Sequence, residues 1–262
     1  MASAGLQGKV AIITGATAGI GKATAIQLAK SNCATVLSGR RVPNLEETKN
    51  ACVESGLSPD KVLIIPGDVT NEDYCKSLVK QTIDKFTRLD ILINNAGIML
   101  DKPNMEQTME DFDRQFNLNV RAVAFLSQQA IPHLIESKGS IVNVSANASQ
   151  MALGLGAYYS MSKAAVDMFT KCYALELGKH GVRVNSVNPG PVKTELLDHH
   201  GKDGADKFRE FVANCLPLHR VGSPEEIAKT IVFLASPDAD YITGVNLMID
   251  GGLFLTNSVA KP

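Results

Sequence analysis

The chain has 262 residues, enough for one large α/β domain or two small ones, and 45% of them are hydrophobic, so a sizeable core can form. Its formal net charge of -1 at pH 7 argues against nucleic acid or an acidic membrane surface as a partner. Small molecules are the expected ligands.

The cysteines and termini set the expected compartment. The five cysteines are odd in number and widely spaced, with no CxxC pair for zinc or redox work, so we expect reduced thiols in a cytoplasmic protein. The N-terminal residues carry no secretory signal, and no apolar run approaches the length that spans a membrane. The five histidines lack metal-ligand spacing, so no metal site is predicted.

The first predicted elements are a buried strand over Val10 to Thr14 and a helix from about Ile20 to Ser31. The glycine-rich run Gly15-Ala-Thr-Ala-Gly19-Ile-Gly21 connects them. Such glycines let the backbone turn tightly and approach a phosphate, whose charge the helix N-terminus stabilises. A simple tight turn is the alternative, but another strand follows at about Ala34 to Gly39, and this placement favours nucleotide binding.

The second strand ends in Ser38-Gly39-Arg40-Arg41. An adenosine ribose with a free 2′-hydroxyl is normally held by an acidic residue near this place, whereas a 2′-phosphate calls for a cation. The guanidinium group matches the geometry of a phosphate. The arginine pair therefore predicts NADP(H) in preference to NAD(H), with a solvated pair in a loop as the alternative.

Two further helix–strand alternations follow. The predicted elements are a helix over Pro43 to Ser55, a strand over Val62 to Ile65, a helix beginning near Asn71 and a strand over Leu89 to Asn94. Asp68, just after the third strand, could accept a hydrogen bond from an adenine amino group or cap the next helix. After the fourth strand, Asn94-Asn95-Ala96-Gly97 contains residues that tolerate tight backbone near a ligand.

A long helical segment is predicted from Thr108 to about Glu136, with one polar residue, Asn119, within its apolar face. A buried asparagine needs hydrogen-bond partners. It is either a core amide satisfied by its neighbours or by water, or a residue that kinks the helix and holds a water molecule in a proton relay.

The stretch from Asn143 to Lys163 follows a predicted strand, Ser140 to Val144, at the end of the sheet where ligands bind. Tyr159 and Lys163 are four residues apart in a helical pattern, so their side chains share one face. A cation there would favour the phenolate and lower the tyrosine pKa from its usual value of about 10.

The last part of the chain contains two more predicted strands, Val182 to Val187 and Val245 to Ile249, and a helix opened by Ser223-Pro224. An irregular segment over about 195–216, with a short helix near 205–214, is typical of a lid or binding loop. Seven strands alternating with helices predict a single α/β domain over residues 1–262, built on one parallel, doubly wound sheet.

Six motifs resemble, in order and over almost the whole chain, those of the short-chain dehydrogenase/reductase family. They are Thr14-Gly15-Ala-Thr-Ala-Gly19-Ile-Gly21, Asn94-Asn95-Ala96-Gly97, Asn119, Tyr159-Ser-Met-Ser-Lys163, Asn188-Pro189-Gly190 and Asp250-Gly251-Gly252. The resemblance implies a Rossmann-type fold, a nicotinamide cofactor, a carbonyl or alcohol substrate and often a homotetramer built on the two long helices. The sequence is most similar in character to carbonyl, xylulose and 3-oxoacyl reductases.

The resemblance also assigns roles. It makes Tyr159 the general acid/base, Lys163 the residue that binds the nicotinamide ribose and lowers the tyrosine pKa, and Asn119 the support of a water molecule. The residues expected to contact the cofactor are Gly15, Thr17, Gly19, Ile20, Gly21, Arg40, Arg41, Asp68, Val69, Asn95, Ala96, Gly97, Tyr159, Lys163, Pro189, Gly190, Val192 and Thr194.

One position departs from the family pattern. The family's serine, which hydrogen-bonds the substrate oxygen thirteen residues before the tyrosine, falls on Ala146. Alanine makes no side-chain hydrogen bond, and losing one donor to a developing oxyanion costs about 2.7 to 4 kcal/mol, roughly a hundred- to a thousandfold in rate.

Three explanations stay open: an engineered substitution, a relocated hydroxyl (Ser145, Ser149 or Tyr158), or a weak enzyme or binding protein. Impaired or engineered catalysis is favoured, because strand alternation should turn Ser145 away from the face of position 146.

The leading functional prediction is therefore an NADP(H)-dependent oxidoreductase acting on a carbonyl or a secondary alcohol. A non-catalytic NADP(H)-binding sensor or scaffold is the alternative, favoured by Ala146 and opposed by the intact Tyr159, Lys163 and Asn119. The residues expected at the substrate are Ser145, Ser149, Met151 and Leu153, with Met99, Leu100 and Met105 as further apolar wall. Ordinary core packing explains the apolar residues almost as well.

Overall fold

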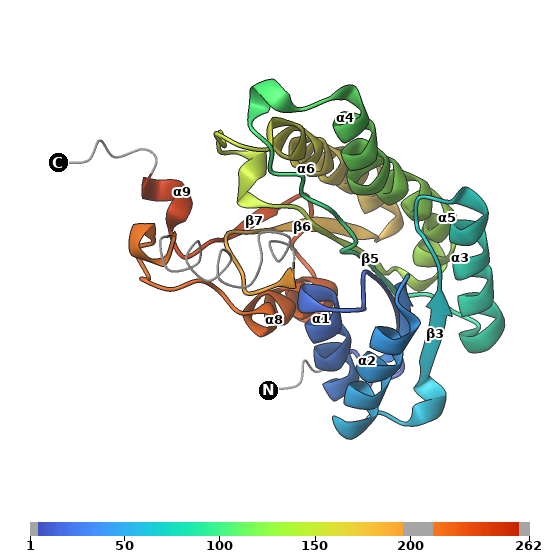
Figure 1. The fold of residues 1–262 in the computed structure, drawn as a ribbon. Coiled ribbons are helices and arrows are strands. Elements are labelled where there is room, and N and C mark those ends of the chain that lie inside the picture. Colours follow the sequence, from blue (N-terminus) through green and yellow to red (C-terminus); the bar gives the residue numbers. More distant parts are fainter. Residues whose placement is uncertain (1–4, 196–211, 257–262) are drawn as a thin grey trace.

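The computed structural model describes residues 5–195 and 212–256. Within them, parallel strands form one sheet in the order β3-β2-β1-β4-β5-β6-β7 (Figure 1). The strands are β1 (Val10–Thr14), β2 (Ala34–Gly39), β3 (Val62–Pro66), β4 (Ile91–Asn94), β5 (Ser140–Val144), β6 (Arg183–Pro189) and β7 (Asn246–Ile249). The predicted α/β class and Rossmann-type order are confirmed. The strand order reverses between β1 and β4, which opens a crevice at their carboxyl ends.

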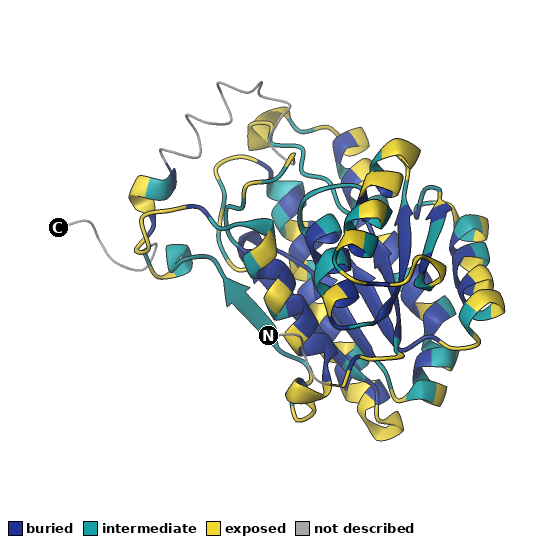
Figure 2. Cartoon of the chain, turned by 90° about the horizontal axis from the view of Figure 1, so that it is seen from below, coloured by how far each residue is buried: buried dark blue, intermediate teal, exposed yellow. Residues whose placement is uncertain are grey.

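Helices cover both faces of the sheet, whose strands form the dark, buried centre of Figure 2. The helices are α1 (Gly19–Lys30), α2 (Val42–Glu54), α3 (Glu72–Phe86), α4 (Met109–Phe116), α5 (Ala122–Ser137), α6 (Ala157–Leu177), α8 (Pro224–Ala235) and α9 (Leu253–Thr256). Alternate side chains of β1 enter opposite cores: Ala11 and Ile13 pack with α1, α2 and α8, whereas Val10 and Ile12 pack with α3, α5 and α6.

Most predicted boundaries lie within one or two residues of the observed ones, because apolar runs and cap residues mark them. Asn71 caps α3 by accepting from the Tyr74 amide, and Ser223 and Glu226 form a capping box at α8. The short helix α9 was not predicted. Of the helix predicted near 205–214, residues 205–211 lie outside the described residues, and residues 212–215 are helical.

The long helix predicted over 108–136 contains an interruption. Residues Asn117–Arg121 form a π-helical turn between α4 and α5, centred on the buried Asn119. A π turn holds one more residue than an α-helical turn and often lies at a functional site. Asn119 therefore lies at an interruption of the helix, and whether it kinks the helix and holds a water molecule stays a prediction.

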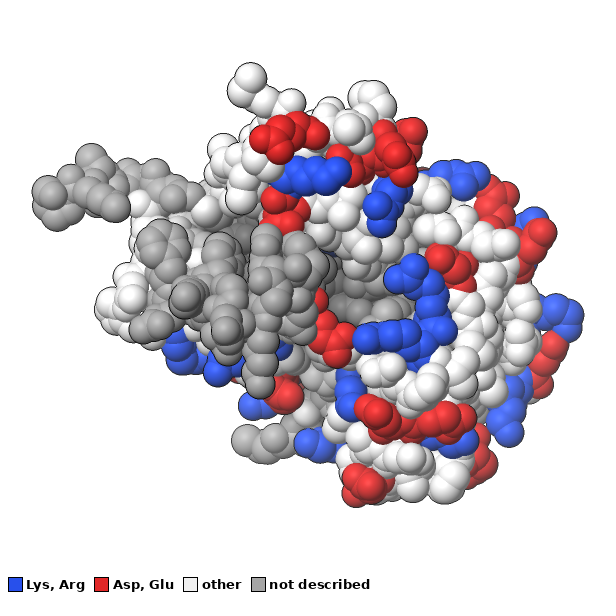
Figure 3. Space-filling model, viewed as in Figure 1, with Lys and Arg blue, Asp and Glu red and all other residues white. Residues whose placement is uncertain are grey.

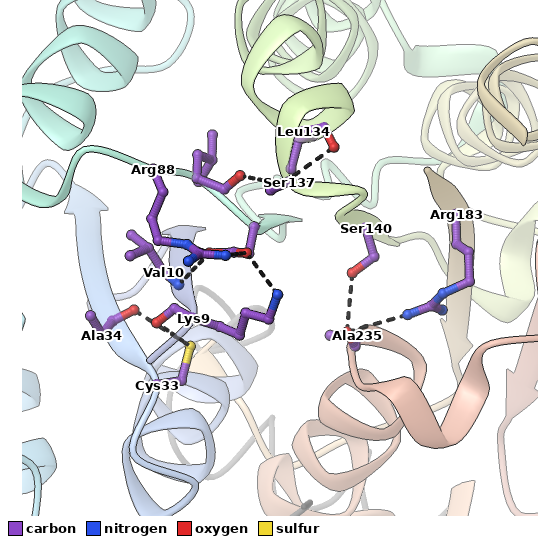
Figure 4. Close-up of polar contacts among 12 residues, drawn as sticks. Lys9, Val10, Cys33, Ala34, Arg88, Leu134, Ser137, Ser140, Arg183 and Ala235 are labelled. Atoms are coloured by element: carbon purple, nitrogen blue, oxygen red, sulfur yellow. Dashed lines mark hydrogen bonds and ion pairs between the residues drawn. The ribbon is translucent and has the colours of Figure 1, made fainter. Parts of the chain in front are cut away.

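Polar contacts fix the amino ends of the strands, opposite the crevice (Figure 4). The buried Asp90 carboxylate accepts from the Val10 amide at 3.0 Å, from Lys9 at 3.1 Å and from both Arg88 Nε and Nη2. Beside it, the Arg183 guanidinium donates to the carbonyls of Leu234, Ala235 and Ser236 at the end of α8. These bonds satisfy carbonyls of the kind that every helix end leaves unpaired.

No described helix is long and apolar enough to cross a membrane.

Candidate active site

A cleft of about 1580 Å³ lies at the carboxyl ends of the central strands. It runs from the glycine-rich turn after β1, past β2 and β4, to the segments that follow β5 and β6. Figure 3 shows this face of the molecule hollowed, with basic side chains gathered on one rim of the hollow. The reversal of strand order creates the cleft, since the loops after β1 and β4 diverge there.

The turn after β1 fits a dinucleotide phosphate. Gly15 adopts a φ of +65°, and a Cβ there would lie 2.8 Å from Asn95 Nδ2, so no larger residue fits. Asn95 holds the turn by donating to the Thr14 and Gly15 carbonyls. No side chain caps the first turn of α1, where Ala18 is the N-cap, so its backbone N–H groups are available to an anion.

Arg40 and Arg41 also line this cleft. Arg41 Nη2 donates to Glu195 Oε2 at 2.8 Å and to Thr17 Oγ1 at 3.3 Å, while Arg40 Nη1 lies 3.9 Å from Asp68 Oδ2. Asp68 accepts from the backbone and hydroxyl of Thr70. It therefore does not cap α3 as one reading of the sequence suggested, because Asn71 holds that position.

Tyr159 and Lys163 share the buried face of α6, as predicted. The helix begins at Ala157, two residues before Tyr159, because Gly156 enters it with a φ of +79°. Lys163 Nζ donates to the Val144 carbonyl at the end of β5 at 2.9 Å and lies 5.7 Å from the centroid of the Tyr159 ring. One backbone carbonyl thus positions the lysine ammonium near the tyrosine ring.

Asn119 is held by three hydrogen bonds. Its Oδ1 accepts from the Ile98 amide at 2.9 Å, and its Nδ2 donates to the Ile98 carbonyl at 2.9 Å and to Ser162 Oγ at 3.0 Å. Asn119 therefore joins the π turn to the chain after β4 and to α6. A Cβ at Gly97 would lie 3.2 Å from Asn119 Oδ1 and 3.4 Å from Lys163 Nζ, so a side chain there would press on Asn119 and touch Lys163.

Burial sets the protonation of the pair. It raises the pKa of the Tyr159 phenol and lowers the pKa of the Lys163 ammonium to about 8, an effect that the Asp167 carboxylate four residues along partly opposes. Burial is the cause of the raised tyrosine pKa, and the expectation that the lysine lowers that pKa stays a prediction. At neutral pH Tyr159 is a neutral proton donor beside a mostly cationic lysine.

Ala146 lies against Tyr159. Its methyl group packs in a small apolar cluster with Ala148, Tyr159, Met99 and Leu153. Position 146, two residues after the end of β5, therefore meets the tyrosine without offering a hydroxyl.

The three hydroxyls that could replace a serine are directed elsewhere. Ser145 donates to the Lys163 carbonyl at 3.1 Å, as strand alternation predicts. Ser149 donates to Asp167 Oδ2 at 2.6 Å and accepts from Asn188 Nδ2. The Tyr158 ring packs edge-on against Phe112. None of these contacts brings a hydroxyl towards Tyr159.

Most residues predicted to be catalytic or to bind cofactor or substrate border this one cleft. Four do not. Gly21 packs α1 against the preceding turn, where a Cβ would lie 2.2 Å from the Gly15 carbonyl oxygen, and Asn119 and Ser149 lie behind the lining. Met105, expected in the apolar wall, is fully exposed outside the cleft.

The sequence reasoning missed several residues that line the cleft, namely Asn147, Pro217, Leu253, Leu255 and Thr256, whereas Cys215 lies in the segment 195–216 that was expected to be a lid or binding loop. Asn147 could have been found, because it directly follows Ala146. The others lie on α9 and on the chain before α8, where no periodic pattern in the sequence predicted their approach.

Comparison with known proteins gives consistent results. A family model described as enoyl-(acyl carrier protein) reductase matches residues 15–254. The chain is similar to a 3-oxoacyl-(acyl-carrier-protein) reductase of Thermotoga maritima, with 38% identity over 251 residues, 95% of this chain and 99% of the relative. It is also similar to a hydroxynaphthalene reductase-like protein of Metarhizium majus, with 36% identity over 258 residues, 94% of this chain and 95% of the relative.

Solved structures give the same picture. A short-chain dehydrogenase/reductase of unknown function from Caenorhabditis elegans, determined with cofactor, matches with a TM-score of 0.92 and 37% identity over 95% of this chain and 96% of that one. A glucose dehydrogenase of the same organism in its apo form matches with a TM-score of 0.82 and 37% identity over 95% of this chain and 99% of that one.

The buried position of Lys163 predicts a low titration midpoint. We expect its ammonium to lose its proton near pH 8, well below the 10.5 of an ordinary lysine, so that the cation is present below pH 8 and lost above it. NMR titration of ¹³Cε-labelled lysines, with Lys163→Met to assign the signal, measures this midpoint. A midpoint above 10 would show that water reaches the amine.

Proposed function

The chain belongs to the short-chain dehydrogenase/reductase family, and from that premise we propose that it is an NADPH-dependent carbonyl reductase. The observation that carries the proposal is the Tyr159–Lys163 pair, buried at the wall of a cleft whose other end fits a dinucleotide. Such a pair is suited to proton transfer at a carbonyl oxygen. A chain that only binds a nucleotide has no evident need of it.

The residues of the pair define the proton chemistry. The nicotinamide, when bound, supplies the hydride. Tyr159, kept neutral by burial, donates its proton to the carbonyl oxygen, and the Lys163 cation stabilises the phenolate that remains. Oxidation of a secondary alcohol would need the phenolate at the start, which burial disfavours. We therefore propose that at neutral pH the enzyme is mostly in the protonated form that serves ketone reduction.

The cofactor proposal rests on charge and backbone shape. The uncapped N-terminus of α1 would hold the pyrophosphate, and Arg40 and Arg41 would hold a 2′-phosphate. Arg41 would exchange its present partner, Glu195, for that phosphate. No acidic residue stands at the end of β2, where a free ribose hydroxyl would need one.

The substrate end of the cleft favours an apolar ketone. Its wall includes Met99, Leu100, Met151, Leu153 and Leu255. The similar proteins of Thermotoga maritima and Metarhizium majus are reductases by their own names, which supports a carbonyl substrate for this chain, whereas one similar structure is a glucose dehydrogenase. A non-catalytic NADP(H)-binding sensor is the competing proposal, and the methyl group of Ala146 is the observation that favours it.

The first test removes the proton donor. We expect Tyr159→Phe to lower the rate of ketone reduction by roughly 10²- to 10⁴-fold, the usual contribution of a general acid, while NADPH still binds. NADPH oxidation with a panel of aryl ketones, 3-oxoacyl esters and α-diketones gives the rate, and nucleotide fluorescence gives the affinity.

Tyr158→Phe is the matched control, because it removes the neighbouring hydroxyl from a ring that packs on Phe112. A wild-type chain that binds NADPH but reduces nothing in the panel supports the sensor instead.

The second test concerns the cofactor. We expect Arg41→Leu to weaken NADPH binding by about 10- to 100-fold, the value of one or two charge-assisted hydrogen bonds, and to leave NADH binding unchanged. Calorimetric titration with both nucleotides measures this difference. Arg121→Leu is the control, because Arg121 is similarly exposed and pairs with Glu72 away from the cleft. Equal affinities of the wild type for NADPH and NADH would contradict the proposal.

We also propose that the chain forms a single catalytic domain and that it assembles as a homotetramer. A cytoplasmic location stays a prediction. The support for assembly is an apolar stripe on the long helix α6, where Met161, Met168 and Leu175 recur every seven residues and are 49%, 58% and 86% exposed. An exposed stripe at helical spacing is typical of a helix that packs on another helix.

The stripe gives a test of assembly. We expect Met168→Glu to convert the tetramer into smaller species, because it places a charge in the apolar contact. Sedimentation velocity at micromolar concentrations measures the masses, and Lys80→Glu on the exposed side of α3 is the control. A wild type that sediments as a monomer would refute the assembly without affecting the proposed reaction.

A further inference from the structure

The proposed reaction develops negative charge on the carbonyl oxygen, and one donor, Tyr159, is already assigned to it. A second donor at this oxygen is typically worth a hundred- to a thousandfold in rate. Ala146 has no side-chain donor, and the hydroxyls of Ser145 and Ser149 are bonded to Lys163 and Asp167. The second donor must therefore come from another residue of the cleft.

Asn147 meets this requirement. It follows Ala146 directly and begins the short 3₁₀ turn Asn147–Ser149, and it borders the cleft. The residue is only 9% exposed, so its side-chain amide needs partners within the protein or from a ligand.

The amide of Asn147 has one partner among the described residues. Its Nδ2 contacts the sulfur of Met151 at 3.3 Å. A thioether sulfur is a weak acceptor, and an amide nitrogen carries two N–H groups. A strong acceptor in the cleft would therefore satisfy a buried donor that the protein itself leaves poorly satisfied.

The backbone beside Asn147 is held firmly. Asn188 Nδ2 donates to the Ala146 carbonyl at 3.2 Å and to both oxygens of the buried Asp167, and the Ser149 amide closes the turn onto the same Ala146 carbonyl. Donors that stabilise a developing charge are effective when their position is fixed before the reaction. The bonds from β6 and α6 fix the base of this turn in that way.

We propose that the side-chain amide of Asn147 donates the hydrogen bond to the substrate's carbonyl oxygen that Ala146 cannot make. This inference rests on the proposed reductase activity and adds a catalytic residue to it. Under this proposal, Ala146 does not mark a lost function. The donor is instead the next residue, and it is an amide in place of a hydroxyl. The enzyme then keeps a two-donor site without a serine at position 146.

The decisive variants change the donor and keep the size of the side chain. Asn147→Leu has no donor, and Asn147→Asp is isosteric but its carboxylate cannot donate. We expect each to lower kcat for ketone reduction by roughly a hundred- to a thousandfold, with NADPH affinity within threefold of wild type. Circular dichroism and the midpoint of thermal unfolding check that both variants fold.

Restoring a hydroxyl at position 146 tests whether Asn147 acts as a hydrogen-bond donor or only stabilises the structure. We expect Ala146→Ser to raise kcat less than tenfold in the wild-type chain, which already has its donor, and more than tenfold in the Asn147→Leu chain. A structural role for Asn147 predicts no such rescue. An active wild type whose kcat survives Asn147→Leu within threefold overturns this inference alone, whereas a wild type that reduces no carbonyl overturns the proposed function as well.

Discussion

The burial of one lysine ammonium constrains the whole site. Removing a cation from water is costly unless it gains a partner, and Lys163 gains the Val144 carbonyl at the end of β5 and the nearby charge of Asp167. The bond from Lys163 to Val144 can form only if α6 brings Lys163 to the carboxyl end of β5. Gly97 lies opposite the amine, where a Cβ would press on Asn119 and touch Lys163. The loop after β4, the π turn and α6 therefore have to fit together as one unit.

Much of this fold could be predicted from the sequence, because its strands are buried on both faces. The runs Val10–Thr14 and Ser140–Val144 consist largely of apolar residues and end in glycine or polar residues, so their limits were readable. Asn71 and Ser223 marked helix starts by the chemistry of their side chains. The helix α9 gave no such signal, because four residues are too few for a periodic pattern.

The candidate site was less predictable, and the reasons are physical. Spacing placed Tyr159 and Lys163 on one face, but it could not show that burial would raise the tyrosine pKa. The direction of Ser149 was also hidden, since it depends on Asp167 and Asn188, which are 18 and 39 residues further along the chain. Met105 matched an apolar wall by composition, although it is fully exposed.

The π turn at Asn119 has a consequence for how this protein can change. A π turn carries one residue more than the α-helical turn that it replaces, so deleting one residue from Asn117–Arg121 would give a more regular helix. Because the extra residue is absorbed within the turn, the following helix keeps its orientation without it, and Leu126, Ala130 and Leu134 would stay in the core. The deletion would instead change the turn that presents Asn119 to Ile98 and Ser162. The irregular turn is therefore required by the site and not by the packing of α5.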